Sequence, residues 1–213
     1  MIDILLYISN GLIIFSFIVY LFLILLNRKN KITSSNGFDT TKDILQDYNS
    51  INIIESTGYL TIYNIKRKVI KIASKCYYGN TLSDISLPLI ESGISATHDN
   101  NNKYITFFSK IIPNLKCLYI FPIISMCING ITYNIEDAKI GIIITVISTI
   151  ISYILIDIKN ESFLWLNKNI KKVKNIDKEK IINFIKNIFL LDKVIFIGEL
   201  IMIIRYVYIM LYL

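Results

Sequence analysis

Two side chains that could do chemistry, Glu91 and His98, lie seven residues apart in one segment. If that segment is helical, a spacing of two turns places both side chains on one face. A carboxylate can accept a proton from zinc-bound water, and imidazole nitrogen is a common zinc ligand. However, His98 is the one histidine in 213 residues. A zinc site with two histidines therefore cannot be built within a single chain, whatever its fold.

Other ligands would have to replace the missing histidines. Cys76, Asp157 or Glu161 could approach Glu91 and His98 in the folded chain. Zinc sites need three or four protein ligands in tight geometry, which makes such a substitute site demanding. The plainer interpretation, which we favour, takes His98 as a polar residue that ends a helix and Glu91 as a solvated or capping carboxylate. The sequence contains no glycine-rich phosphate loop, nucleophile elbow or metal-spaced cysteine cluster that would indicate another chemistry.

The segment after Thr81 is predicted to be helical and would carry both side chains. Thr81 and Asp84 have the spacing of a capping box, and apolar residues then recur at helical period as far as Ala96. Pro88 interrupts this pattern because its nitrogen cannot donate a hydrogen bond to the carbonyl of Asp84. The helix is therefore expected either to kink at Pro88 or to begin near Leu87.

Residues 28–110 as a whole predict a small folded α+β domain, since polar residues and glycines separate short apolar groups. Thr40 to Tyr48 reads as a short helix. The alternation in Gly58 to Tyr63 and in Lys68 to Ala73 predicts a β-hairpin. Further along, Asp177 to Leu190 predicts a helix with one apolar and one lysine-rich face, which either packs against the domain or lies on a bilayer surface.

The remaining chain is dominated by long apolar runs. Hydrophobic residues make up 54% of the sequence and charged residues 18%, which exceeds what a soluble domain of this size carries. A helix needs about 20 apolar residues to cross a hydrocarbon core of about 30 Å. Four segments are predicted to span a bilayer: Ile4 to Leu26, Cys117 to Ile135, Ile140 to Ile156, and Val194 to Leu213.

Polar residues within and between these segments refine the prediction. A short polar turn at Glu136, Asp137 and Lys139 is expected to join the second and third spans into a helical hairpin. The last span contains Glu199 and Arg205, which are six residues apart and so do not share one helical face. Their partners are expected on other helices.

The predicted fold is a mainly α membrane protein with about four transmembrane helices and a small α+β cytoplasmic domain. Its expected parts are an N-terminal anchor (1–27), the α+β domain (28–110), a transmembrane hairpin (111–158), a basic helical segment (159–193) and a C-terminal transmembrane helix (194–213).

The distribution of basic residues predicts the orientation. Of the 23 lysines and arginines, eleven lie in residues 28–110 and nine in residues 159–193. Because cytoplasmic flanks are enriched in these residues, both regions are expected in the cytoplasm and both termini outside a cell membrane. The charge is accounted for by a lipid bilayer as partner, so no nucleic acid is expected.

The order of these features resembles the bacterial membrane-bound neutral zinc metallopeptidases nearly from end to end. Matching segments are the N-terminal anchor, the helix at Gly37 to Leu45, Gly58-Tyr59-Leu60-Thr61, the strand at Lys68 to Ile72, and Tyr78-Gly79-Asn80-Thr81. The signature helix of the family, His-Glu-x-Gly-His-Ala-x-Gln-His, corresponds here to residues 90–98, Ile-Glu-Ser-Gly-Ile-Ser-Ala-Thr-His.

The resemblance implies a zincin-like domain that uses zinc, with Glu91 at the position of the general base. Ile90 and Ile94 stand where the family has its first two ligand histidines, and Lys159 stands where it has a carboxylate. His98 is the surviving candidate ligand. Arg205 matches an arginine that the family keeps in its last span.

Isoleucine has no lone pair to give a metal, so we expect no cofactor and no catalysis. The chain is then interpreted as a binding or regulatory homologue whose partner is another membrane protease or an active relative. The alternative is a membrane-bound zinc-dependent metallopeptidase with a non-standard metal site. A third hypothesis is a transport or channel component that uses Glu199 and Arg205.

Overall fold

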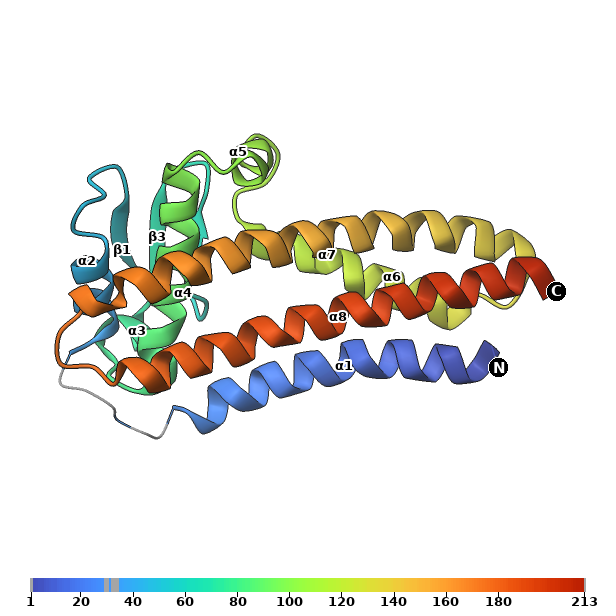
Figure 1. Ribbon diagram of the computed structural model, residues 1–213, viewed down its shortest axis with the longest axis horizontal. Coiled ribbons are helices and arrows are strands. Elements are labelled where there is room, and N and C mark those ends of the chain that lie inside the picture. Colours follow the sequence, from blue (N-terminus) through green and yellow to red (C-terminus); the bar gives the residue numbers. More distant parts are fainter. Residues whose placement is uncertain (1, 29–30, 32–34, 213) are drawn as a thin grey trace. The chain divides into compact units, whose positions relative to one another are not determined.

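The computed structural model describes residues 2–28, 31 and 35–212 of the chain (Figure 1). The chain forms two compact units. Unit 1 contains the chain up to Leu21, residues 118–156 and the chain from Leu190; unit 2 contains residues 22–117 and 157–189. Unit 2 thus gathers the expected α+β domain, of which residues 29–30 and 32–34 lie outside the described part, together with most of the expected basic segment.

Three helices are long and apolar enough to cross a membrane. They are α1 (Ile2–Leu26), α7 (Ile135–Asn169), which a 3-10 turn (η2, Ile170–Lys172) extends, and α8 (Lys178–Tyr212). At 1.5 Å per residue, even the 25 residues of α1 reach about 37 Å, more than the hydrocarbon core of about 30 Å. The chain is therefore mostly helical, with three candidate spanning helices and one small sheet.

The second expected span, Cys117 to Ile135, differs from the prediction. Its residues form the 3-10 helix η1 (Leu115–Tyr119) and the α-helix α6 (Ile120–Ile131). Together, η1 and α6 form one apolar helical stretch, Leu115–Ile131, which is shorter than the three long helices; α6 by itself extends about 18 Å. The helix stops at Thr132, whose backbone is extended.

The expected turn at Glu136, Asp137 and Lys139 also lies elsewhere. The connection is residues 132–134, and the three charged residues belong to the first turns of α7. Asn134 explains this start, because its side-chain oxygen accepts a hydrogen bond from the backbone N–H of Asp137 at 2.8 Å. Such a bond satisfies an N–H group that has no partner within the helix.

The expected boundaries at residues 158 and 193 fall inside helices. Asp157 and Lys159 lie within α7, and the predicted helix over Asp177 to Leu190 continues into the C-terminal span as the single helix α8. No proline stands in α7 or α8. Without a proline, nothing removes a backbone donor there, so each helix runs on past the change in composition.

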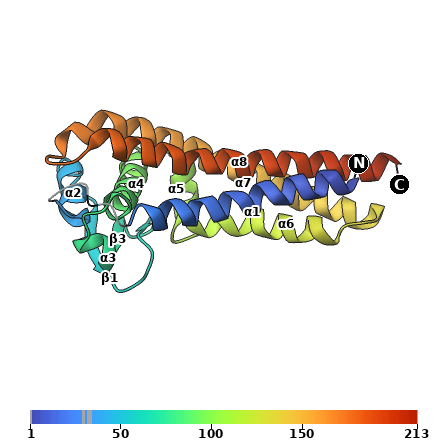
Figure 2. The ribbon, with the colours of Figure 1, turned by 90° about the horizontal axis from the view of Figure 1, so that it is seen from below.

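In unit 1, parts of α1, α6, α7 and α8 run side by side (Figures 1 and 2). Their shared core consists of Ile13, Ala138, Ile195, Met202, Tyr206 and Ile209. Two glycines permit close packing: a Cβ at Gly198 would lie 3.0 Å from Ile13, and a Cβ at Gly141 would lie 2.6 Å from the Tyr206 ring. Small residues at such contacts are typical of packed membrane helices.

Unit 2 holds a three-stranded sheet of order β1-β3-β2. The hairpin is confirmed, since β2 (Ile62–Asn64) is antiparallel to β3 (Val69–Ala73). However, β2 overlaps its predicted segment, Gly58 to Tyr63, only in its first two residues. The strand β1 (Asn52–Ser56), which the sequence did not predict, pairs parallel with β3. Short helices α2 (Gly37–Ile44), α3 (Ser74–Tyr78) and α5 (Lys103–Ser109) complete the unit.

The helix α4 (Leu82–Asp99) packs against β2 and β3 and begins where the capping box predicted. The hydroxyl of Thr81 accepts a hydrogen bond from the N–H of Asp84 at 3.3 Å and donates to the Asp84 carboxylate at 2.6 Å. Because α4 starts at Leu82 with Pro88 inside it, the alternative start near Leu87 was wrong. Because Pro88 has no N–H, the carbonyl of Asp84 receives no helical hydrogen bond from it. Gly37 lies close to this carbonyl: a Cβ at Gly37 would be 2.8 Å from its oxygen.

We predict that Gly141→Ala destabilises the protein by about 1 to 3 kcal/mol, because the new methyl group would displace the fully buried Tyr206 ring. Gly11→Ala is the matched control, since a Cβ there would meet no described atom within 4 Å other than those of its chain neighbours and its own helix backbone. Replacing this helix glycine by alanine should leave the stability of the protein unchanged or raise it slightly. Thermal unfolding in detergent compares the two, and equal melting temperatures would contradict the packing described.

Candidate functional site

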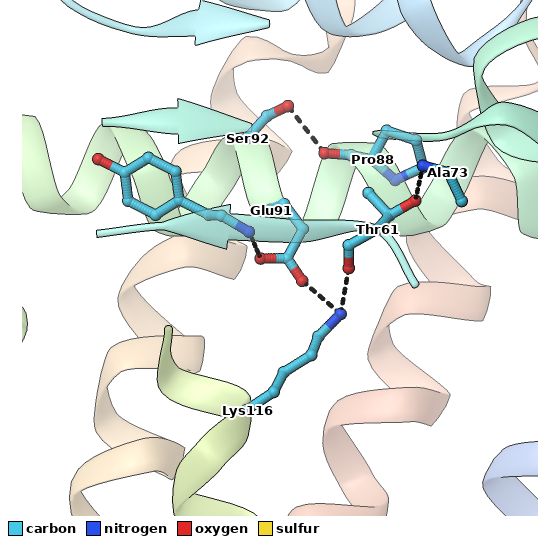
Figure 3. A network of polar contacts seen from close by, with 7 residues as sticks. Thr61, Ala73, Pro88, Glu91, Ser92 and Lys116 are labelled. Carbon is cyan, nitrogen blue, oxygen red and sulfur yellow. Dashed lines mark hydrogen bonds and ion pairs between the residues drawn. The ribbon is translucent and has the colours of Figure 1, made fainter. Parts of the chain in front are cut away.

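Glu91 is buried in the middle of α4, and each of its carboxylate oxygens has a partner (Figure 3). Oε1 lies 2.8 Å from the Lys116 ammonium, and Oε2 accepts a hydrogen bond from the backbone N–H of Tyr63 at 2.8 Å. Only 4% of Glu91 is exposed. The interpretation of Glu91 as a solvated or capping carboxylate was therefore wrong.

Three separate segments position this ion pair. Glu91 comes from α4, Tyr63 from β2, and Lys116 from the η1 turn. The Lys116 ammonium also donates to the carbonyl of Thr61, and the Thr61 hydroxyl accepts from the backbone N–H of Ala73 at 3.2 Å (Figure 3). The lysine is thus held between the helix and the segment that leads into β2.

His98 lies on the same face of α4 as Glu91, as the spacing of seven residues predicted. The backbone of Tyr63 binds the Glu91 carboxylate, and the Tyr63 hydroxyl lies 2.9 Å from Nδ1 of His98. His98 is in the last turn of α4, in agreement with the sequence interpretation, but it is buried rather than solvated. One tyrosine therefore connects both candidate residues to the sheet.

The surroundings of His98 favour its neutral form. Burial lowers the pKa of His98 below its usual value, the nearby Lys68 lowers it further, and Asp99 acts weakly in the opposite direction. Burial, together with the charge of Asp99, raises the pKa of the Tyr63 hydroxyl. Both groups are then uncharged near neutral pH. With the imidazole proton on Nε2, the Tyr63 hydroxyl donates to Nδ1.

Asp99 has its own partners at the edge of the site. Lys68 binds its carboxylate at 2.7 Å and the Ser50 hydroxyl donates to it at 2.7 Å. The hydrogen bond from Lys68, followed by that from Ser50, lowers the pKa of Asp99. This pair is partly exposed, so it adds little stability.

Three residues were expected to stand where the resembled family has metal ligands, and each of them contacts other parts of the chain. Ile90 and Ile94 are buried. Between them, a Cβ at Gly93 would lie 3.0 Å from the Leu166 side chain, so α4 approaches α7 closely here. Lys159 lies with its ammonium 5.4 Å from the centre of the Phe189 ring, an arrangement that favours a cation–π interaction.

The substitute ligands considered from the sequence bind elsewhere. The Cys76 thiol contacts the Asp84 carboxylate at 3.9 Å, and burial raises the pKa of that thiol. Glu161 accepts a hydrogen bond from Asn102 at 2.7 Å. Among the described residues, no three histidine, cysteine, aspartate or glutamate side chains are grouped so that they could hold a metal ion.

Asp157 and Glu161 instead line an open polar pocket of about 550 Å³ at the end of α4. Its other lining residues are Thr97, Asn100, Asn101, Asn102, Lys103, Tyr104 and Trp165. The pocket mixes two carboxylates, one ammonium and several amides, which gives it no single charge to select a ligand.

Sequence reasoning missed Lys116 and Tyr63, the two residues that bind Glu91. One signal was present: Lys116 is the single charged residue between Pro113 and Ile135, at the start of an apolar run. A lone charge beside apolar residues often has a specific partner. The partner itself, 25 residues earlier in the chain, could not be read from spacing.

No protein-family model matches the chain, and comparisons with curated proteins and with solved structures give no match either. The resemblance to neutral zinc metallopeptidases thus depends on the motifs alone.

We predict that His98 titrates below its ordinary pKa of about 6.5. The folded state then binds this proton more weakly than the unfolded state, so the contribution of His98 to stability is complete above pH 6.5 and is lost as the pH falls towards the folded-state pKa. Because the chain has one histidine, labelling with ¹³C-histidine gives one signal to follow by NMR. A midpoint at or above 6.5 would contradict the buried neutral imidazole.

Proposed function

We propose that this chain is a non-catalytic membrane protein, related to the neutral zinc metallopeptidases, that acts by binding another membrane protein. One observation carries the proposal: both oxygens of the Glu91 carboxylate are occupied, by the Lys116 ammonium and by the backbone N–H of Tyr63. A general base needs a lone pair directed at the water or group that it deprotonates. In Glu91 each carboxylate oxygen already binds a group of the chain, and the side chain is buried.

The charge of Glu91 is also compensated from within the chain. In a zinc hydrolase of the resembled type, the metal supplies positive charge beside the glutamate and activates the water. Here the Lys116 ammonium supplies the positive charge, but it has no open coordination position to offer a water molecule. The isoleucines at positions 90 and 94 add apolar packing where metal ligands would stand.

A binding role fits a chain of this kind. The three apolar helices support a location in a membrane. We propose that unit 2 lies on the cytoplasmic side, where its lysines favour contact with anionic headgroups, and that the termini lie outside. The proposed partner is another membrane protease or an active relative, with which a related fold could associate without cutting a substrate.

We predict that the purified full-length protein contains far less than one zinc per chain and does not cleave casein. Inductively coupled plasma mass spectrometry measures the zinc, and the assay includes added zinc. In the zinc measurement and the cleavage assay, Glu91→Gln and the exposed-site control Glu136→Gln should give the same result as the unmodified protein. Near-stoichiometric zinc, with cleavage that Glu91→Gln abolishes and Glu136→Gln does not, would overturn the proposal and favour a zinc peptidase with a non-standard site.

A further inference from the structure

Four hydroxyl side chains lie along one face of α7 in unit 1: Thr145, Ser148, Thr149 and Ser152. Their spacing of three, four and seven residues repeats with the helix and extends over about 10 Å of its length. All four are buried. A polar face inside a helix that is apolar enough to cross a membrane either joins helices or surrounds a polar ligand.

A second observation distinguishes these possibilities. Glu199 of α8 is fully buried, and its Oε1 accepts a hydrogen bond from the Ser148 hydroxyl. The Ser152 hydroxyl is a second hydroxyl group near this carboxylate. The other oxygen, Oε2, has no hydrogen-bond partner among the described residues. Helix association alone does not account for a buried carboxylate oxygen that is left unpaired, because such a group costs several kcal/mol.

The neighbouring charged groups are engaged elsewhere. On α8 itself, the Asp192 carboxylate accepts a hydrogen bond from the Tyr119 hydroxyl at 2.5 Å. The Arg205 guanidinium donates to the backbone carbonyls of Asn129 and Thr132 at 3.1 and 2.7 Å, where it satisfies the end of α6. These bonds confirm that Glu199 and Arg205 have partners on other helices.

The other helices of unit 1 bring no further charge to Glu199. The buried residues of α1, α6 and α7 in this unit that carry polar side chains are serine, threonine and asparagine, and the remaining titratable group in the interior is the Tyr206 hydroxyl. About one helical turn before Ser148, the Thr145 hydroxyl binds the Ser125 hydroxyl of α6 at 2.7 Å. Among the described residues, the surroundings of the carboxylate are thus hydroxyl oxygens without a compensating cation.

We propose that Glu199, with the hydroxyls of Ser148 and Ser152, binds one small monovalent cation, either a proton or a sodium ion. Both bind to carboxylate and hydroxyl oxygens, and either one neutralises the carboxylate and occupies the unpaired Oε2. In the proton case, hydronium transfers its proton to the carboxylate and leaves water, and no other bond changes. This site is independent of the proposed function of unit 2.

A fluorescent hydrophobic carbodiimide tests the site in the full chain, reconstituted in lipid nanodiscs. This reagent modifies protonated carboxyl groups in apolar surroundings: the carboxyl proton moves to a carbodiimide nitrogen, and the carboxylate oxygen bonds to the central carbon. Peptide mass spectrometry then gives the modified residue. We expect modification of Glu199 that falls about tenfold for each pH unit on the alkaline side of its titration.

The variants and the sodium arm separate the two ligands. Glu199→Gln should lose the modification, whereas Glu136→Gln, at an exposed carboxylate of the same unit, should keep it. If the modification of Glu199 decreases as the pH rises but does not respond to sodium, the site binds a proton. If the modification decreases when sodium is added at constant pH, the site binds sodium. Ser148→Ala should shift the profile, since it removes the hydroxyl that binds Oε1.

Infrared spectroscopy covers the case in which the reagent cannot reach the site. A band of a protonated carboxyl that changes with pH or sodium, and that Glu199→Gln removes, would also support the proposal. The proposal would be overturned if the modification and the infrared band changed with neither pH nor sodium. It would also be overturned if neither signal were observed.

Discussion

The ion pair between Glu91 and Lys116 is the interaction on which the arrangement of unit 2 depends. It joins the middle of α4 to the η1 turn, and through Tyr63 and Thr61 it joins both to the start of β2. A buried carboxylate without such partners would have to be desolvated at a cost of several kcal/mol. The same contacts that make the burial of Glu91 possible also fix where the helix meets the sheet.

This arrangement gives two side chains of α4, Glu91 and His98, structural roles. Glu91 binds a lysine and a backbone amide, and His98 binds a tyrosine hydroxyl. Both contacts are to groups of the chain itself. Glu91 and His98 thus form a polar connection between α4 and β2, and Tyr63 is the residue that both side chains share.

Local patterns in the sequence predicted much of this fold. The capping box at Thr81 located the start of α4, the two-residue alternation located the β2–β3 hairpin, and a spacing of seven placed Glu91 and His98 on one face. These features depend on residues close together in the chain, for which helical and strand periodicity is informative. Three of the four apolar runs likewise correspond to helices of spanning length.

The remaining features depend on contacts between distant residues. The strand β1 is recognisable only by its parallel pairing with β3, which begins 17 residues after Asn52 at Val69. The short α6 ends where the guanidinium of Arg205, far along the chain, donates hydrogen bonds to the carbonyls of Asn129 and Thr132. Lys116 could be singled out as a lone charge, but its pairing with Glu91 is a property of the folded unit. Periodicity cannot supply such partners.

A double-mutant cycle on Glu91 and Lys116 measures how strongly this ion pair stabilises unit 2. Glu91→Gln, Lys116→Met and the double variant are compared by chemical unfolding in detergent, beside the same cycle on the exposed pair Glu136 and Lys139. We predict a coupling energy of about 1 to 3 kcal/mol for Glu91 and Lys116, and less than about 0.5 kcal/mol for the exposed pair. A Glu91–Lys116 coupling no larger than that of the exposed pair would contradict this prediction.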